Sequence, residues 1–305
     1  MGLVGHLCRR NLRLFLRDPV TLVFTMSAPL IMMGLFVVFY RETTAEQIAL
    51  VFTTARGSAE GYDMADAYGL CDAWLFAACV TLATFACSLG MLASFVEDRA
   101  SGRFSDYLVS PVRRWQLTCG YISSSFIVAC LISIGFLILG QLWALLLGQA
   151  VMSPGQFAAA VGATALGCLF FASFHLLWIT FLMSQGGLGG YSLLGGITVG
   201  FLAYCYVPPV SLSATVNNVV GSLPFAQEAS LIRQPVMAPA VERLLGAIDV
   251  PAAADAIRTG LARSLGARLY VNDAALPVAL MALVLAGLAI FFAVGGVWRM
   301  GRVIR

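Results

Sequence analysis

The sequence contains no lysine, so all 18 of its basic residues are arginines. A phosphate-binding loop of the form GxxxxGK[ST] needs its lysine to reach the β- and γ-phosphates of a nucleotide. The chain therefore holds no such loop. If ATP hydrolysis drives this protein, another polypeptide supplies the nucleotide site.

Charged residues of both signs are scarce. Only 11% of the 305 residues are charged and 60% are hydrophobic, whereas soluble domains have about 25% charged and about 45–50% apolar residues. So few charges do not cover the surface of a soluble domain of this size. The composition predicts an integral membrane protein, and the lengths of its apolar runs predict an all-α fold.

Groups that bind metals or perform catalysis are also few. The eight cysteines form no CxxC pair, and the two histidines, His6 and His175, lie far in sequence from any cysteine cluster. We therefore expect no metal site, no catalytic residue and no cofactor bound by this chain. His175 is the one clear ionisable residue predicted inside a span, and a hydrogen-bonded packing role is favoured over a ligand role.

Six apolar runs are long enough to cross a membrane, which takes about 20 residues. They predict spans at about 19–40, 73–96, 116–148, 155–183, 187–207 and 275–298, in a single transmembrane domain covering residues 1–305. The acidic stretch 41–72 is expected to be an outer loop. The outer region 208–274 is broken by prolines, including Pro208, Pro209 and Pro224, and therefore predicts re-entrant or interfacial helices before the last span.

Residues 2–17 predict a basic amphipathic helix at the membrane surface, in contact with lipid headgroups. Arg9, Arg10, Arg13 and Arg17 fall on its polar side, and the other side carries apolar residues that include Leu14. Asp18 and Pro19 follow as the expected start of the first span, an N-cap and then a proline at the first helical position.

The placement of arginine predicts the orientation. If the N-terminus is cytoplasmic, the inner segments hold eleven of the eighteen arginines but only four of the fifteen acidic residues. Cytoplasmic loops carry such an excess of arginine. With six spans, both termini are then expected in the cytoplasm.

The fifth run is rich in glycine and contains two GxxxG pairs, Gly186 with Gly190 and Gly196 with Gly200. Such pairs let helix backbones approach closely. Packing within one bundle is the favoured interpretation, and a subunit contact or a role in lining a pathway is the alternative.

The segment FVEDRASGRFSDYLVSPVRRWQL, residues 95–117, separates the second and third runs. Its glycine permits a turn, and Phe104, Tyr107 and Leu108 then share one face of a short helix that Pro111 ends. The segment is either a docking helix at the cytoplasmic mouth or an ordinary arginine-bearing loop that sets the topology.

This segment resembles the signature of the ATP-binding cassette (ABC) type 2 permeases, through Glu97, Gly102, Leu108, Pro111 and Arg113. The stretch RDPVTLVFTMSAPLIMMGLF looks like the start of that family's first span, and YVPPVSLSATVNNVVGSLPFAQEASLIRQ is similar to its re-entrant region. Two departures exist. Tyr121 follows Gly120 where family members often have a lysine, and the outer stretch 237–270 is longer than expected.

The resemblance implies that residues 2–17 are an elbow helix and that the segment after the second span is a coupling helix. The residues that it assigns to ATPase coupling are Glu97, Asp98, Arg99, Gly102, Arg103, Phe104, Tyr107, Leu108, Pro111, Arg113 and Arg114. It implies two partners, an ABC ATPase chain that holds ATP and Mg²⁺ and a second permease copy, identical or distinct. Spans two and five would line a path between the copies.

The implied function is the transmembrane permease of an exporter in the bacterial cytoplasmic membrane, with lipid around it and no nucleic-acid partner. A path with almost no charge suits an amphipathic or hydrophobic cargo such as a drug, a lipid-like molecule or a peptide. Two other hypotheses stay open: a membrane assembly or immunity factor that binds a partner without transport, and a membrane enzyme that depends on His175.

Overall fold

The computed structural model describes residues 3–56, 64–102, 114–182, 184–246 and 251–303. Helices dominate this part of the chain, in agreement with the all-α prediction, and a two-stranded hairpin is added. The elements are α1 (Leu3–Arg17), α2 (Pro19–Leu35), the π-helical turn η1 (Phe36–Tyr40), α3 (Arg41–Arg56), α4 (Met64–Ala100), α6 (Arg114–Leu146), α7 (Pro154–Ile179), α8 (Gln185–Leu202), the 3₁₀ turn η2 (Pro209–Ser211), α9 (Ala214–Ser222), α10 (Pro224–Leu245), α11 (Pro251–Ser264), β1 (Tyr270–Val271), β2 (Ala274–Ala275) and α12 (Val278–Val303).

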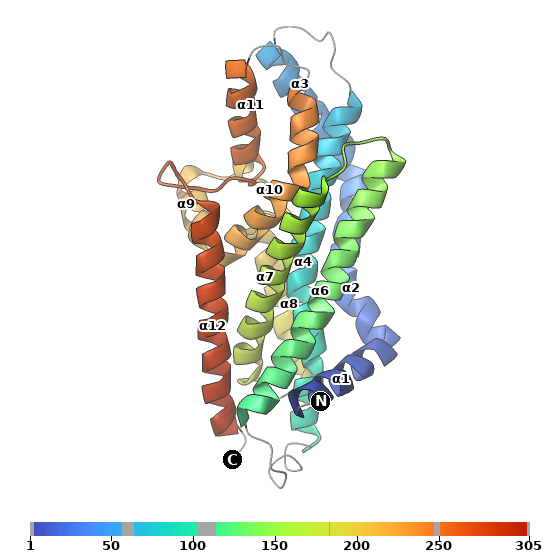
Figure 1. The fold of residues 1–305 in the computed structure, drawn as a ribbon, viewed down its shortest axis with the longest axis vertical. Coiled ribbons are helices and arrows are strands. Elements are labelled where there is room, and N and C mark those ends of the chain that lie inside the picture. Colours follow the sequence, from blue (N-terminus) through green and yellow to red (C-terminus); the bar gives the residue numbers. More distant parts are fainter. Residues whose placement is uncertain (1–2, 57–63, 103–113, 183, 247–250, 304–305) are drawn as a thin grey trace.

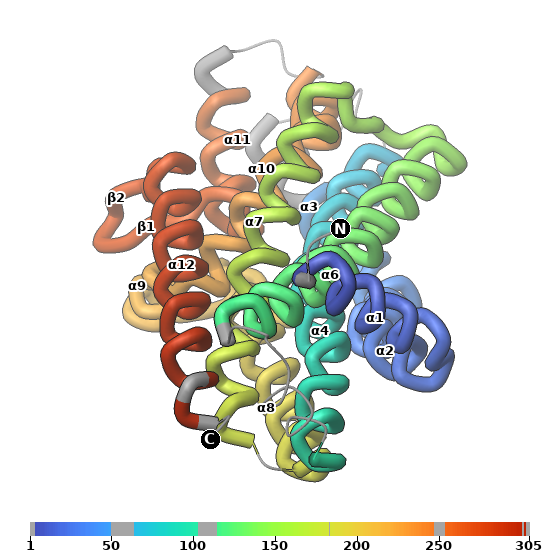
Figure 2. Tube along the Cα trace, turned by 60° about the horizontal axis from the view of Figure 1, so that its bottom comes forward, coloured from blue at the N-terminus to red at the C-terminus, as the bar shows by residue number. Residues whose placement is uncertain are grey.

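The long helix α4 is the centre of the bundle. It packs against α2, α6, α7, α8 and α10, and α12 covers the outer side of α7 and α10. Both chain termini lie at one end of the bundle, where α1 lies obliquely across the other helices (Figures 1 and 2). We call this end the terminal end and the opposite one, near α3 and α11, the distal end.

Five helical stretches of the described chain are long and apolar enough to cross a membrane: Pro19–Ala49, Met64–Ala100, Trp115–Leu146, Pro154–Ile179 and Val278–Met300. The predicted span at 187–207 coincides with α8, a helix of 18 residues that is not among these five. The total of six spans therefore stays a prediction.

The start of the first span is as predicted. Asp18 caps α2, since its Oδ1 accepts hydrogen bonds from the backbone N–H groups of Val20 and Thr21, both at 3.1 Å, and Pro19 occupies the first helical position. Hydrogen bonds from the hydroxyl and N–H of Thr21 hold the pKa of Asp18 below its ordinary value. The cap therefore satisfies two backbone N–H groups in the first turn of α2.

One predicted loop is largely helical, and the helices predicted in the outer region are present. Much of the expected loop 41–72 belongs to α3 and to the first turns of α4. In the outer region, α10 runs through Pro235 and Pro239 without a break. A proline inside a helix loses one hydrogen bond and crowds the carbonyl four residues earlier, but most of α10 is buried against neighbouring helices, and that packing offsets the cost.

Candidate functional site

A buried carboxylate holds the helices together at the terminal end. Asp98, in the last turn of α4, is 1% exposed, and Arg10 of α1 donates to both of its oxygens, at 2.8 and 2.9 Å. The hydroxyl of Tyr121, on α6, donates to Asp98 Oδ2 at 2.6 Å. We call Arg10, Asp98 and Tyr121 the Asp98 cluster. It joins α1, α4 and α6 at one point.

Residues 3–17 form the predicted helix, but two of its side chains lie on the opposite side from the one predicted. Leu7, Cys8 and Phe15 are buried as expected, but Leu14 is 46% exposed. Arg10, which the pattern placed on the headgroup side, turns inward because Asp98 offers a charged acceptor for its planar fork. Arg9, Arg13 and Arg17 remain exposed.

Arg99, beside Asp98 in α4, links α7 to this end of the bundle. Its Nη1 donates to the backbone carbonyls of Thr180 at 2.9 Å and Leu182 at 3.0 Å, at and just beyond the end of α7. Carbonyls at a helix C-terminus lack partners within the helix and carry partial negative charge. The arginine therefore caps α7 from α4.

The predicted turn that follows α4 is present. Gly102 has a φ of 75°, a left-handed conformation that suits glycine at the end of a helix, and its N–H donates to the carbonyl of Arg99. Glu97 lies in the last turns of α4, and Arg114 is the first residue of α6. The other predicted coupling residues lie outside the described residues: Arg103, Phe104, Tyr107, Leu108, Pro111 and Arg113.

The two GxxxG pairs of α8 differ in what they pack against. A Cβ at Gly200 would overlap the ring of Tyr206, and Gly196 lies beside Phe85, so the second pair packs within the chain. Gly190 has no atom within 4 Å of such a Cβ, and for Gly186 the nearest is 4.0 Å away. A Cβ at Gly195, which lies outside the two GxxxG pairs, would come within 2.7 Å of the Phe85 ring, so this glycine allows the close packing of α8 against α4.

Spans two and five, which were expected to line a path, correspond to α4 and α8, and these two helices differ in how much of their surface is exposed. In the most apolar stretch of α4, 89% of the residues are buried within the chain, which leaves little of that helix free to line a path. On α8, by contrast, Leu193, Leu194 and Ile197 are exposed. Of the two helices, α8 is the one with an apolar face available to cargo, lipid or another subunit.

The three prolines singled out in the outer region lie at or directly before helix starts. Pro208 precedes η2, Pro209 is its first residue, and Pro224 begins α10. These are the positions at which proline's missing N–H and fixed φ are tolerated.

Glu228 and Arg233, both on α10, are fully buried, which the sequence pattern does not predict. Glu228 accepts a hydrogen bond from the Thr84 hydroxyl of α4 at 2.9 Å, and Arg233 donates to the carbonyls of Ala203 and Tyr204 at 2.9 and 2.7 Å. Both residues lie outside the predicted spans, in the outer region, yet both are buried in the helix bundle. The available signal was an acid and an arginine five residues apart inside the otherwise weakly charged stretch LPFAQEASLIRQPVM.

The side chain of Glu228 fits between α10 and α7 because residue 167 of α7 is a glycine. A Cβ at that position would overlap Glu228 Oε1. Among the described residues, Glu228 Oε2 and the Nε and Nη1 of Arg233 have no hydrogen-bond partner. Buried polar atoms of this kind are uncommon in proteins and are costly to leave unsatisfied.

His175 has the hydrogen-bonded packing environment that was favoured for it. Its Nδ1 lies 2.9 Å from the Tyr191 hydroxyl and its Nε2 lies 3.2 Å from the Phe85 carbonyl. The rings of Phe85 and Phe171 enclose it. Within the described ranges, no three histidine, cysteine or acidic side chains are grouped so as to hold a metal ion.

Comparison with known proteins identifies the family. A comparison with the curated proteins finds no match. A family model described as ABC-2 type transporter matches residues 3–214, which include α1, the Asp98 cluster, Arg99 and most of the bundle. Because this match covers more than half of the chain, the protein belongs to the ABC-2 type transporter family, as a membrane-spanning permease subunit.

Proposed function

We propose that this permease exports an amphipathic or hydrophobic molecule, driven by ATP that a separate ABC ATPase chain hydrolyses. The Asp98 cluster and Arg99 support the proposal. They join the last turn of α4 to α1, α6 and α7, directly before the segment predicted to dock on the ATPase. A force applied to that segment would then reach four helices together, since hydrogen-bonded networks between rigid helices transmit displacement.

The charge at the terminal end supports a cytoplasmic location for both termini. Exposed arginines there include Arg9, Arg13, Arg17 and Arg302, and arginines close to the ends of spans are typical of the cytoplasmic side. The exposed apolar face of α8 supports an amphipathic or hydrophobic cargo, or contact with a second permease copy.

Reconstitution with the cognate ATPase tests the proposal. Proteoliposomes loaded with a fluorescent amphipathic dye are assayed for ATP-dependent transport, and binding of the purified ATPase to the permease is measured separately. We expect Leu108→Asp to lose ATPase binding and transport, whereas Arg258→Gln, at the distal end, leaves both at the wild-type level. Wild-type binding and transport in Leu108→Asp would refute the coupling role.

An assembly or immunity factor predicts a different result. Such a protein binds its partner but moves no dye and no labelled phospholipid, even when the wild-type chain and its ATPase are reconstituted together. ATP-dependent movement of either probe excludes that alternative.

A further inference from the structure

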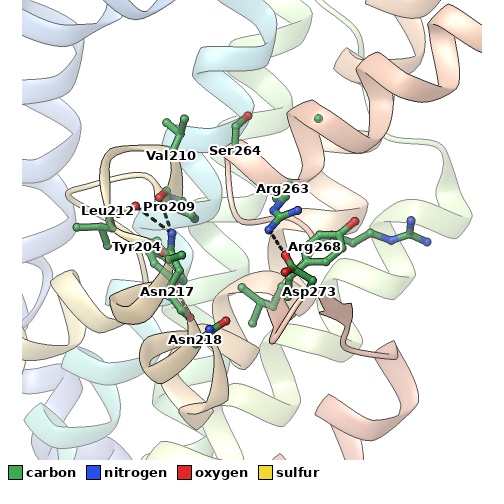
Figure 3. A pocket seen from close by; sticks show the side chains of 14 residues that line it. Tyr204, Pro209, Val210, Leu212, Asn217, Asn218, Arg263, Ser264, Arg268 and Asp273 are labelled. Carbon is green, nitrogen blue, oxygen red and sulfur yellow. Dashed lines mark hydrogen bonds and ion pairs between the residues drawn. The ribbon is translucent and has the colours of Figure 1, made fainter.

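The outer region builds a pocket that none of the predicted sites uses. The pocket has a volume of about 330 Å³ and lies between α9, the end of α11 and the β1–β2 hairpin (Figure 3). This volume is near the lower limit for small-molecule sites, which are typically about 300–1,000 Å³. It is large enough for the headgroup of a lipid but not for a whole one.

Side-chain hydrogen bonds fix the walls of the pocket. Asn217 donates from Nδ2 to the carbonyls of Pro209 at 2.8 Å and Leu212 at 3.3 Å, which holds the loop after α8 against α9. Asn218 accepts at Oδ1 from the backbone N–H of Asn272 at 2.9 Å, which holds the hairpin turn against α9.

The buried Arg233 supports the floor. It binds the carbonyl of Tyr204, a pocket residue that has a φ of 54°. A left-handed conformation is unfavourable for a bulky side chain and persists only where its surroundings hold it. A Cβ at Gly266 would also lie 3.2 Å from Arg233 Nη1 and 3.1 Å from Pro209, so the loop, α10 and the end of α11 meet closely here. The pocket is thus held from three sides.

An arginine faces the asparagines across the pocket. Arg263 donates to Asp273 at 2.8 Å and stacks over the Tyr270 ring, with the guanidinium carbon 4.7 Å from the ring centre. Figure 3 shows this pair opposite Asn217 and Asn218, whereas Arg268 extends away from them. The ion pair uses Nη2 of Arg263, and the Nε and Nη1 groups have no hydrogen-bond partner among the described residues. Nδ2 of Asn218 likewise has none there.

These donors favour an anionic group. A guanidinium offers two parallel N–H groups that match a phosphate or a carboxylate. Arg263 and Asp273 are 58% and 87% exposed, and an exposed ion pair of this kind contributes little stability, so a ligand oxygen can compete with Asp273 for the arginine.

The surroundings favour an amphiphile over a soluble anion. The hairpin leads directly into α12, and the stretch of α12 that is long and apolar enough to cross a membrane begins at Val278, so the pocket lies beside the start of that stretch. Valines on these elements are exposed: Val210 at the pocket itself by 69%, Val219 of α9 by 59% and Val278 by 52%. Apolar side chains beside a basic pocket match a molecule with a charged head and an apolar tail.

We propose that this pocket binds the anionic headgroup of an amphiphile, with Arg263 as the main contact for its phosphate or carboxylate and Asn218 as a second donor. This binding proposal holds for transport in either direction. It also does not require the predicted ATPase contact at the other end of the bundle.

Binding of short-chain lipids to the purified full chain in neutral maltoside detergent tests this site. The probes are dihexanoyl phosphatidylglycerol, inorganic phosphate and uncharged dihexanoylglycerol. We expect only the phosphatidylglycerol to bind well. Inorganic phosphate binding as tightly would show a site for a free anion, and dihexanoylglycerol binding as tightly would show an apolar site without headgroup recognition. Either result overturns the proposal.

Replacing either member of the Arg263–Asp273 ion pair is expected to affect lipid binding differently. Arg263→Gln is expected to weaken phosphatidylglycerol binding about tenfold or more, the loss of roughly one charge-assisted contact. Asp273→Asn removes the competing carboxylate and is expected to leave binding equal or tighter. Arg258→Gln, an exposed arginine on the same helix, serves as the control with an expected change below about threefold.

Melting temperatures without lipid check that the variants fold, and both residues of the ion pair are exposed enough to be replaced without loss of the core. Wild-type lipid affinity in Arg263→Gln overturns the proposal. So does an equal loss of affinity in Arg263→Gln and Asp273→Asn, since that result indicates a structural role for the ion pair.

Discussion

Asp72 and Asp98 occupy opposite ends of α4, and each binds an arginine from the first helices of the chain through two hydrogen bonds. Arg10 of α1 binds Asp98 at 2.8 and 2.9 Å, and Arg41, the first residue of α3, binds Asp72 at 2.8 and 2.9 Å. At 1.5 Å per residue, the two aspartates are roughly 39 Å apart along the helix. The N-terminal helices are therefore fastened to the central helix at both ends of the bundle.

At the terminal end, Asp98→Asn is expected to destabilise the protein by about 1–3 kcal/mol, because it weakens charged hydrogen bonds at a buried acceptor while Arg10 keeps partial access to water. Thermal unfolding in detergent measures the loss. The double variant Arg10→Gln with Asp98→Asn should cost less than the sum of its single changes. Arg13→Gln, exposed on the same helix, should change little, and strict additivity would contradict a direct interaction.

At the distal end, Asp72 accepts from Trp143 Nε1 at 3.0 Å and Gln149 Nε2 at 2.7 Å in addition to Arg41. Asp72→Ala removes the shared acceptor of three donors, and we expect it to destabilise by about 3–5 kcal/mol. The comparison is Asp66→Ala, which breaks a more exposed ion pair with Arg243 and should cost no more than about 1 kcal/mol. Equal losses in the two variants would show that burial does not control the effect.

The close packing of Gly167 against Glu228 predicts a rescue. Gly167→Ala places a methyl group against the Glu228 carboxylate and should cost about 1–3 kcal/mol through overpacking. Adding Glu228→Ala, which opens the space, should recover part of the stability lost in Gly167→Ala. Gly162→Ala is the control, because nothing lies within 4 Å of a Cβ there. If the double variant is as unstable as the two single losses combined, the contact is not the cause.

The Arg99 contact with α7 predicts a loss of transmission rather than of docking. Arg99→Gln removes the charged donor from the carbonyls of Thr180 and Leu182. With the cognate ATPase present, we expect nearly unchanged ATPase binding but several-fold less transport per ATP hydrolysed. Hydrogen exchange near residues 179–182 should rise in the same variant. Arg9→Gln, exposed on α1, should leave both measurements unchanged, and unchanged transport in Arg99→Gln would remove α7 from the proposed mechanism.

The features that the sequence predicted correctly depend on local patterns. The apolar runs, the amphipathic α1, the Asp18–Pro19 helix start and the turn at Gly102 each depend on residues within a few positions of one another. The family resemblance, confirmed by the match over residues 3–214, also depends on such short patterns in a fixed order.

Tertiary structure alone decided the partners of the charged residues. Arg10 faces Asp98 from 88 positions away, Glu228 meets Thr84 from 144 positions away, and the pocket near Arg263 assembles from four separate segments. A charged side chain on an amphipathic pattern is assigned to water by default. Whether it turns inward depends on an opposite charge or a glycine space on another helix, and only the packing of the helices brings those groups together.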